Sequence, residues 1–162
     1  MDELIEELAA TKSTLAHLLA EATEKQLDAQ VDGGWSARTI VAHLRDDEYL
    51  CMRPAMTRMM VEDVPDVYFL DGADWEPNRN RRRDRKEWLL ADFALQRQAS
   101  LDILRALRSS DLERRGKQDG KEFTIEQLVG AWAKHDREHI AQLEDAIGET
   151  LADVLRRRAR MG

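Results

Sequence analysis

Residues 124–147 read TIEQLVGAWAKHDREHIAQLEDAI and carry the clearest helix signal in the chain. Thr124 is a good N-cap, and Gln127 three residues later completes the pattern of a capping box. Apolar side chains recur along this stretch with a period of about 3.6 residues. Gly148 follows directly and is a typical C-terminal stop. We therefore predict an amphipathic helix over residues 124–147.

The same periodicity recurs elsewhere in the chain. It predicts helices over about residues 2–23, 36–60 and 84–108, and a short basic helix over about 150–160. Ser36 is the expected N-cap of the second helix, with Trp35 before it packing on the first turns. Asp84 is the expected cap of the third helix, with Glu87 as its capping-box partner. Pro54 lacks an N–H, so we expect the second helix to kink near it.

A long and chemically divided stretch separates the second and third helices. Residues 62–76 hold six acids and no base, and residues 79–86 hold six bases and one acid. Prolines and a glycine interrupt any periodicity there, so we expect an ordered crossover loop. The chain is thus predicted to be an all-α four-helix bundle, a single domain over residues 1–162, with a long crossover loop between helices two and three.

Composition and charge narrow the classes of function. Of the 162 residues, 43 % are hydrophobic, and the net charge is −7. A negative protein opposes the counterion release that drives nucleic-acid binding, so we expect no nucleic-acid partner. Because no apolar run approaches about 20 residues, we expect no membrane span. The single cysteine, Cys51, excludes an internal disulfide and is compatible with the reducing cytoplasm, where we expect the protein to lie.

Three of the four histidines fall on the inward faces of predicted helices. His135 and His139 lie at i and i+4 on the apolar stripe of residues 124–147, one turn apart. His43 lies on the apolar stripe of the second helix. His17 lies off the stripe of the first helix, and we expect it to be exposed to solvent.

This placement predicts a metal site. Three buried imidazoles without partners would cost about 1–3 kcal/mol each, whereas one divalent cation would satisfy all three. We therefore predict that His43, His135 and His139 bind a divalent metal ion; the alternative for each is a neutral buried histidine satisfied by a hydrogen bond. Three nitrogens leave coordination positions open, which is typical of a catalytic site. Zn, Ni, Cu and Fe all suit imidazole ligands.

We interpret the other polar residues by how close they lie to the apolar stripes that carry the three histidines. Asp47, one turn after His43, is the candidate catalytic acid or base; the alternative is that it orients a ligand imidazole. Gln142, three residues after His139, is a second candidate for such an orienting role. Charges further from the stripe are expected to be solvated: Glu48, Asp136 and Glu138. We expect Cys51 to be a small buried hydrophobe.

The crossover loop supplies candidate binding residues. If it closes one mouth of the bundle, Trp75 would line a pocket with Tyr68 and Phe69. Arg79 is the candidate for receiving an anionic substrate or a cofactor carboxylate, and the arginines of residues 81–83 are equivalent alternatives. The competing interpretation is that the loop's arginines pair with its acids, pair across a dimer, or lie in solvent.

These motifs resemble the DinB/YfiT-like superfamily of metalloenzymes over essentially the whole chain. The resemblance is carried by Trp35-Ser36, His43-Leu44, and His135-Asp136 followed by His139 and Gln142. It implies an up-down-down-up four-helix bundle, usually a homodimer, with Zn or Ni held by His43, His135 and His139. Better-studied relatives are thiol-dependent: mycothiol-dependent maleylpyruvate isomerase and bacillithiol S-transferases.

We therefore predict a divalent-metal-binding protein that acts as a metal-dependent thiol (S-)transferase on small molecules, with a low-molecular-weight thiol as a further cofactor. Two alternatives remain open: a metal-dependent hydrolase, and a non-catalytic, stress-related metal-binding or dimerisation module. A pocket would separate them. An enzyme needs open metal positions beside apolar and cationic side chains, whereas a structural module would fill that space.

Overall fold

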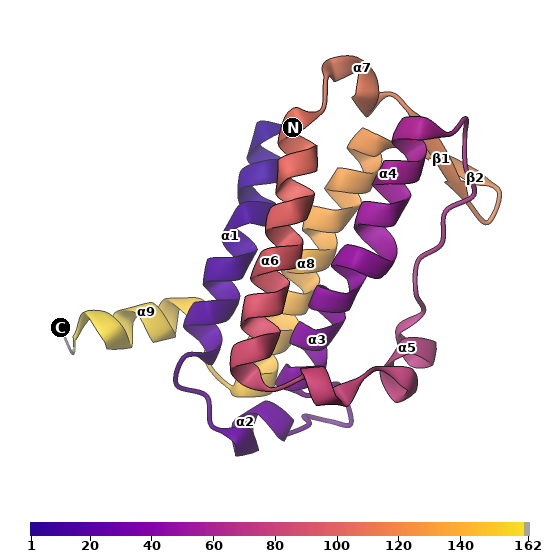
Figure 1. Cartoon of the computed structure of the whole chain (residues 1–162). Coiled ribbons are helices and arrows are strands. Elements are labelled where there is room, and N and C mark those ends of the chain that lie inside the picture. The colour runs from indigo at the N-terminus through magenta and orange to yellow at the C-terminus, as the bar shows by residue number, and fades with distance from the viewer. Residues whose placement is uncertain (161–162) are drawn as a thin grey trace.

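Four helical walls pack lengthwise in the computed structural model, which describes residues 1–160 (Figure 1). The walls are α1 (Asp2–Leu19), α3 (Ala37–Asp47) continued by η1 (Glu48–Met52) and α4 (Arg53–Val61), α6 (Lys86–Ala106) and α8 (Ile125–Ile147). Figure 1 shows α3–α4 and α6 running in the same direction, with α1 and α8 opposed to them. This is the up-down-down-up order, and the crossover loop makes it possible by returning the chain to the end where α3 began.

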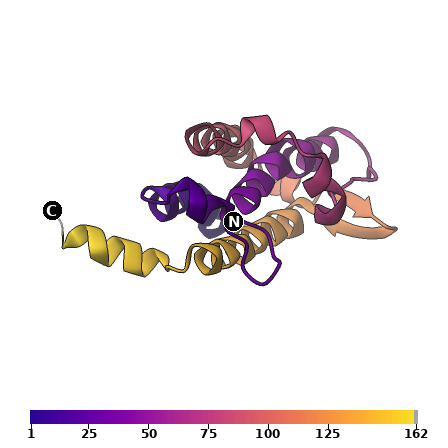
Figure 2. The same ribbon diagram turned by 90° about the horizontal axis from the view of Figure 1, so that it is seen from below.

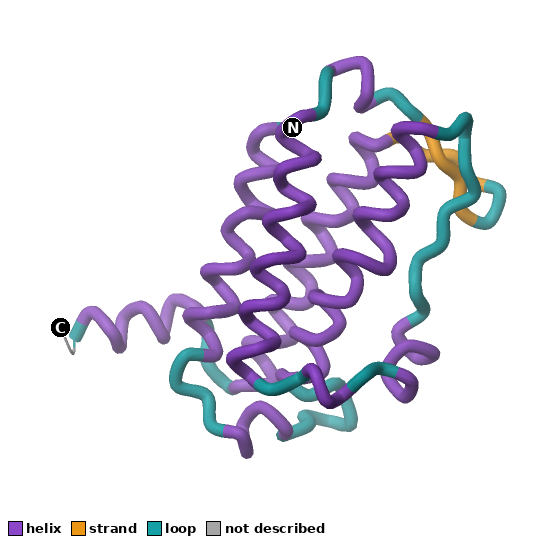
Figure 3. Tube along the Cα trace, viewed as in Figure 1, coloured by secondary structure: helices purple, strands orange, loops and turns teal. Residues whose placement is uncertain are grey.

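Shorter elements occupy the connections and the C-terminal end (Figure 3). They are α2 (Glu24–Asp28), α5 (Gly72–Asn78), the 3-10 turn η2 (Arg81–Arg83), α7 (Ser109–Leu112), the strands β1 (Arg115–Gln118) and β2 (Lys121–Thr124), and α9 (Leu151–Ala159). Seen from below, α9 extends away from the bundle (Figure 2). Over residues 1–160, none of the helices combines the length and the apolar character that a membrane span requires.

The second long helix of the bundle, formed by α3, η1 and α4, is irregular near its centre. Between Asp47 and Arg53 the helix widens into the π-helical turn η1. Pro54 explains this turn, because its ring clashes with the carbonyl four residues earlier and it offers no N–H to that carbonyl. The irregularity expected near Pro54 is therefore a π turn that precedes it.

Two predicted helix starts and ends differ in the structure. The first helix ends at Leu19, because Thr23 begins α2 with its own capping box to Gln26. The third helix begins at Lys86 without a side-chain cap. Asp84 does not cap it, because its buried carboxylate accepts a hydrogen bond from Arg45 at 3.1 Å. A buried guanidinium needs a counter-charge more than a helix end needs a cap.

The polar stretch before α8 contains a β-hairpin that the sequence analysis did not predict. β1 and β2 pair antiparallel around Asp119 and Gly120, which both have positive φ. Asp-Gly is a favoured dipeptide for such a turn, so the signal was present in the sequence. The crossover loop attaches to this hairpin, because the N–H of Val67 donates to the carbonyl of Lys117 at 2.8 Å. The loop is thereby held against the same end of the bundle as α4.

The helix from Thr124 is framed as predicted. Thr124 and Gln127 form a capping box, and Gly148 ends α8 in the left-handed conformation. Beyond it, Thr150 and Asp153 form a second capping box at the start of α9. These caps satisfy N–H and carbonyl groups that a helix end leaves without intrahelical partners.

The core consists of two apolar clusters, with polar residues between them on every wall. The first cluster includes Leu15, Leu44, Phe93 and Leu143. The second cluster includes Leu8, Met52, Leu101 and Ala133. Buried polar residues that fall between the two clusters in sequence include Thr11 on α1, Glu48 on η1, Arg97 on α6 and Asp136 on α8. The candidate functional site lies beside this polar layer.

Candidate metal centre

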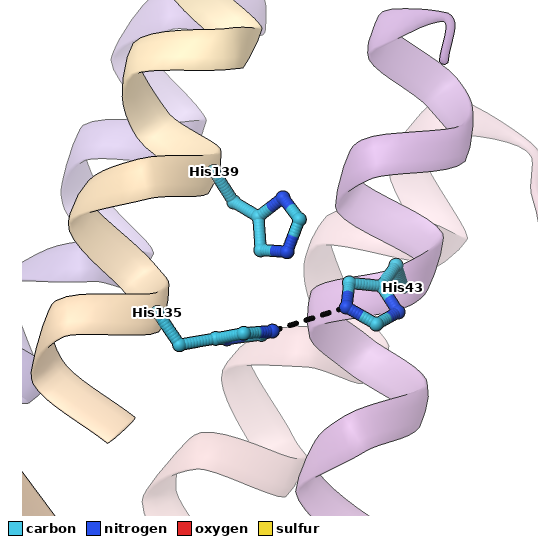
Figure 4. A group of neighbouring side chains, drawn as sticks. All are labelled: His43, His135 and His139. Carbon is cyan, nitrogen blue, oxygen red and sulfur yellow. Dashed lines mark hydrogen bonds between the residues drawn. The ribbon is translucent and has the colours of Figure 1, made fainter. Parts of the chain in front are cut away.

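Three histidines from two helices meet at one point (Figure 4). His43 comes from α3, and His135 and His139 come from successive turns of α8. Each offers a ring nitrogen, and the three nitrogens lie within 4.8 Å of one another. The Nε2 atoms of His43 and His135 are 3.0 Å apart. We call these three residues the histidine cluster.

This spacing fits a single metal ion. Two nitrogens bound to one ion at about 2.1 Å lie about 3.4 Å apart in tetrahedral geometry. Nδ1 of His139 donates a hydrogen bond to Oε1 of Gln142 at 2.8 Å, which leaves its Nε2 as an unprotonated ligand atom. Gln142 therefore lies where an orienting residue is expected.

The histidines are held in the neutral form that binds metals. Burial, together with the neighbouring His139 and His135, lowers the pKa of His43 to about 3. Burial likewise lowers the pKa of His135 to about 4 and lowers the pKa of His139. A ligand histidine must be deprotonated, so protons compete weakly with a metal at neutral pH.

Asp47 lies against two of the three rings. Its Oδ2 is 3.5 Å from Nε2 of His43 and 3.3 Å from Nε2 of His135. Burial raises the pKa of the Asp47 carboxyl to about 7, and the nearby Glu48 and Asp46 carboxylates also raise it. A carboxyl with such a pKa can accept and return a proton near neutral pH.

Cys51 does not offer a thiolate to this site. It is buried, and its Sγ accepts a hydrogen bond from the N–H of Leu70 at 3.2 Å. Burial and the Asp47 carboxylate raise the pKa of the thiol to about 12. The side chain therefore stays protonated and acts as a small buried group that links the helix to the crossover loop.

A cavity of about 440 Å³ adjoins the histidine cluster and Asp47. Its apolar lining comes from the bundle and from the crossover loop: Trp35, Met52, Phe69, Leu70 and Leu128. The loop thus closes one side of the site, as expected. Among residues 1–160, no lysine or arginine lines this cavity. The cationic side chains that the sequence analysis placed at the mouth are elsewhere.

Neither Trp75 nor Arg79 lines this cavity. Trp75 is buried, and its Nε1 donates to Oδ2 of Asp46 at 3.0 Å while its ring packs 5.2 Å from the ring of His43. The Arg79 side chain is 4 % exposed and pairs with Asp84. The structure therefore does not bring Arg79 to the metal centre, and it favours the interpretation that the loop's arginines pair with nearby acids. The exposed Arg81 does the same with Glu76.

Trp35 has a role at the site that the sequence analysis missed. Its ring is parallel to that of His139 at 6.1 Å and lies 5.0 Å from that of His43. It fits closely against Gly72 at the start of α5, where an added Cβ would lie 2.7 Å from the Trp35 ring. Trp35 is therefore a wall of the cavity, held in place by the crossover loop.

Glu48 and Asp136 are buried, which corrects the prediction that they are solvated. Both bind Arg97 of α6, whose side chain is also fully buried. Their neighbour Glu138 is exposed, as expected, and pairs with Lys134. Helical spacing places both acids off the apolar stripe and therefore predicts that they are exposed. It does not reveal that Arg97 on another helix neutralises them in the core.

Comparisons with known proteins agree with this architecture. The structure is similar to that of YfiT from Bacillus subtilis, described as a probable metal-dependent hydrolase with an unusual four-helix bundle topology. The TM-score is 0.78 at 22 % sequence identity, and the alignment covers 92 % of this chain and 88 % of YfiT. No curated protein matches the sequence. The sequence profile of the DinB superfamily matches residues 7–143. The chain therefore belongs to the DinB superfamily.

Proposed function

We propose that this protein holds one divalent metal ion, Zn or Ni, through His43, His135 and His139 and uses it to transfer a thiol onto a small molecule. The observation that carries the proposal is the arrangement of the site. Three neutral imidazoles and a carboxyl whose pKa is about 7 border one largely apolar cavity of about 440 Å³. A purely structural metal site is closed, whereas this one opens onto space for a ligand.

The chemistry follows from the groups that line the cavity. A divalent ion bound there would lower the pKa of a coordinated thiol or water. Asp47 accepts the proton of the thiol at Oδ2, the sulfur forms a bond to the electrophilic carbon, and the bond to the leaving group breaks. The same carboxyl then returns the proton to the leaving group. Trp35, Phe69 and Leu70 exclude water from the attacking sulfur.

A hydrolase is the second candidate, because Asp47 can equally accept a proton from water. The description of YfiT as a probable metal-dependent hydrolase supports this alternative. The non-catalytic module is less consistent with the structure, because the cavity beside the histidines is not filled by side chains. Metal chemistry is common to both enzymatic candidates, so the nucleophile is what an experiment must distinguish.

The test loads the purified protein with Zn²⁺ or Ni²⁺ and measures turnover with two panels. One combines low-molecular-weight thiols with electrophiles, and the other contains esters and amides. We expect saturable, metal-dependent conjugation, lost in His43→Ala together with the metal, and lowered about 10²–10⁴-fold in Asp47→Asn with the metal retained. His17→Ala is the matched control, because His17 is outside the histidine cluster.

Two results would overturn the proposal in different ways. Hydrolysis without conjugation would replace the transferase with the hydrolase. Turnover in neither panel, with full metal occupancy in the wild type, would favour the non-catalytic module.

A further inference from the structure

The buried ion cluster next to the metal centre joins the two elements that carry it. We define the arginine cluster as Arg97, Glu48, Asp136, Thr11 and Ser100. We propose that Arg97 is a positioning residue for the metal centre, because it clamps η1 to α8 one residue away from Asp47 and His135. This inference rests on the metal site proposed above and concerns how that site keeps its geometry.

The clamp is made by one guanidinium that binds both acids. Arg97 Nε donates to Glu48 Oε1 at 2.7 Å. On its other side, Nη1 donates to Asp136 Oδ2 at 2.6 Å and Nη2 donates to Asp136 Oδ1 at 3.0 Å. Such a bidentate guanidinium–carboxylate pair fixes the relative orientation of the two side chains as well as their distance.

Each clamped acid is the direct neighbour of a residue of the metal centre. Glu48 follows Asp47 and Asp136 follows His135. Consecutive helical residues point about 100° apart, so on each element one side chain faces Arg97 while its neighbour faces the cavity. Any shift of Glu48 or Asp136 therefore also shifts the backbone that carries Asp47 or His135.

The clamp has little freedom to adjust. Arg97 packs against the rings of Phe93 and Trp132, with its guanidinium carbon 5.0 and 5.4 Å from their centroids. Its Nη1 also donates to the carbonyl of Leu8 at 2.7 Å. Its donors are thus bonded to α1, η1 and α8, and a lysine could not reproduce this fork.

Neutral hydroxyls complete the clamp. The Thr11 hydroxyl donates to Asp136 Oδ2 at 2.6 Å, and the Ser100 hydroxyl donates to Glu48 Oε2 at 2.7 Å. Both acids are therefore held from two directions. These contacts also provide milder variants that leave every charge in place.

The test measures Co²⁺ and Zn²⁺ affinity by chelator competition, and the Co²⁺ absorption spectrum at saturation. We expect Arg97→Lys to weaken metal binding about 10–100-fold and to change the Co²⁺ spectrum of the fully loaded protein. Thr11→Val combined with Ser100→Ala should weaken binding about tenfold. This second variant tests the proposal even if Arg97→Lys does not fold.

The control is Leu104→Ala, a cavity-forming change two turns further along α6 in the second apolar cluster. It should lower stability but leave metal affinity and the Co²⁺ spectrum unchanged. Wild-type affinity and spectrum in both cluster variants would overturn the clamp. Failure of the proposed metal site is distinguishable from failure of the clamp, because the wild type would then bind no more metal than His43→Ala.

Discussion

The histidine cluster and the arginine cluster are built from adjacent residues, yet they differ in how far their polar atoms are satisfied. In the arginine cluster, both carboxylate oxygens of Glu48 and of Asp136 accept hydrogen bonds. In the histidine cluster and Asp47, three buried atoms have no partner among residues 1–160: Nδ1 of His43, Nδ1 of His135 and Oδ1 of Asp47. An unpaired buried polar atom costs about 1–3 kcal/mol.

This difference indicates that the arginine cluster has a structural role and that the histidine cluster has a ligand-binding role. The arginine cluster is closed, and Arg97 and Glu48 are fully buried. The histidine cluster opens onto a cavity, and the His135 side chain is 23 % exposed. A satisfied buried cluster holds helices together, whereas ring nitrogens that converge beside a cavity, as the Nε2 atoms of His43 and His135 do, form a site that a ligand can reach.

Removing the centre of the closed cluster should have the largest effect. We expect Arg97→Met to lower the free energy of unfolding by about 3–5 kcal/mol, because it leaves two carboxylates buried without a cation. Chemical denaturation of the metal-free protein measures this loss. The exposed Arg137, which pairs with Glu7, is the matched control and should cost less than about 1 kcal/mol on the same change. Equal losses would erase the distinction between the clusters.

Acidification should lower the free energy of unfolding through the buried histidines of the histidine cluster. The lowered pKa values of His43 and His135 mean that the unfolded chain binds protons below about pH 6.5 while the folded chain does not, until about pH 3–4. Stability therefore falls as the pH falls. Asp47 acts in the opposite direction, because its raised pKa lets the folded state bind a proton first.

The measurement therefore uses metal-free Asp47→Asn, which removes the opposing group. We expect it to lose about 2 kcal/mol of unfolding free energy between pH 7 and 5.5. Proton NMR of the imidazole signals should show His43 and His135 still neutral at pH 5.5. Titration midpoints near 6.5 for both rings would show that the open cluster is not desolvated.

A smaller effect is expected at the wall of the cavity. Gly72→Ala would push against Trp35, since the new Cβ would lie 2.7 Å from its ring, and should cost about 1 kcal/mol. Tryptophan fluorescence should shift, while metal affinity stays the same. Gly130→Ala on α8 is the control, because an added Cβ there meets nothing within 4 Å, and it should stabilise the helix slightly. Unchanged fluorescence in Gly72→Ala would remove Trp35 from the account.

Local signals in the sequence were sufficient for the main walls of the fold. The capping box of Thr124 and Gln127 and the stop at Gly148 act within one or two turns, so the bounds of α8 could be predicted. The three histidines could be brought together in advance because each lies on an apolar stripe and stripes face inward.

What could not be predicted depends on partners distant in sequence. Arg97 lies on the apolar face of α6, 49 residues from Glu48 and 39 from Asp136, and no local spacing links them. The sequence predicts Arg79 as an anion-binding residue because it shows no partner for the guanidinium. Its partner in the structure is Asp84, which the sequence predicts as a helix cap. Hydrophobic periodicity describes the faces of one helix, so it cannot predict an ion pair between residues that are distant in sequence.

The most direct test of the central claim is X-ray absorption spectroscopy at the metal edge of the purified protein, with metal content measured on the same sample. We predict one divalent ion per chain with three imidazole nitrogens in its shell, and the loss of that signal in His135→Ala. In protein prepared without added thiols, a sulfur ligand, fewer than two imidazoles, or an unchanged signal in His135→Ala would contradict the account.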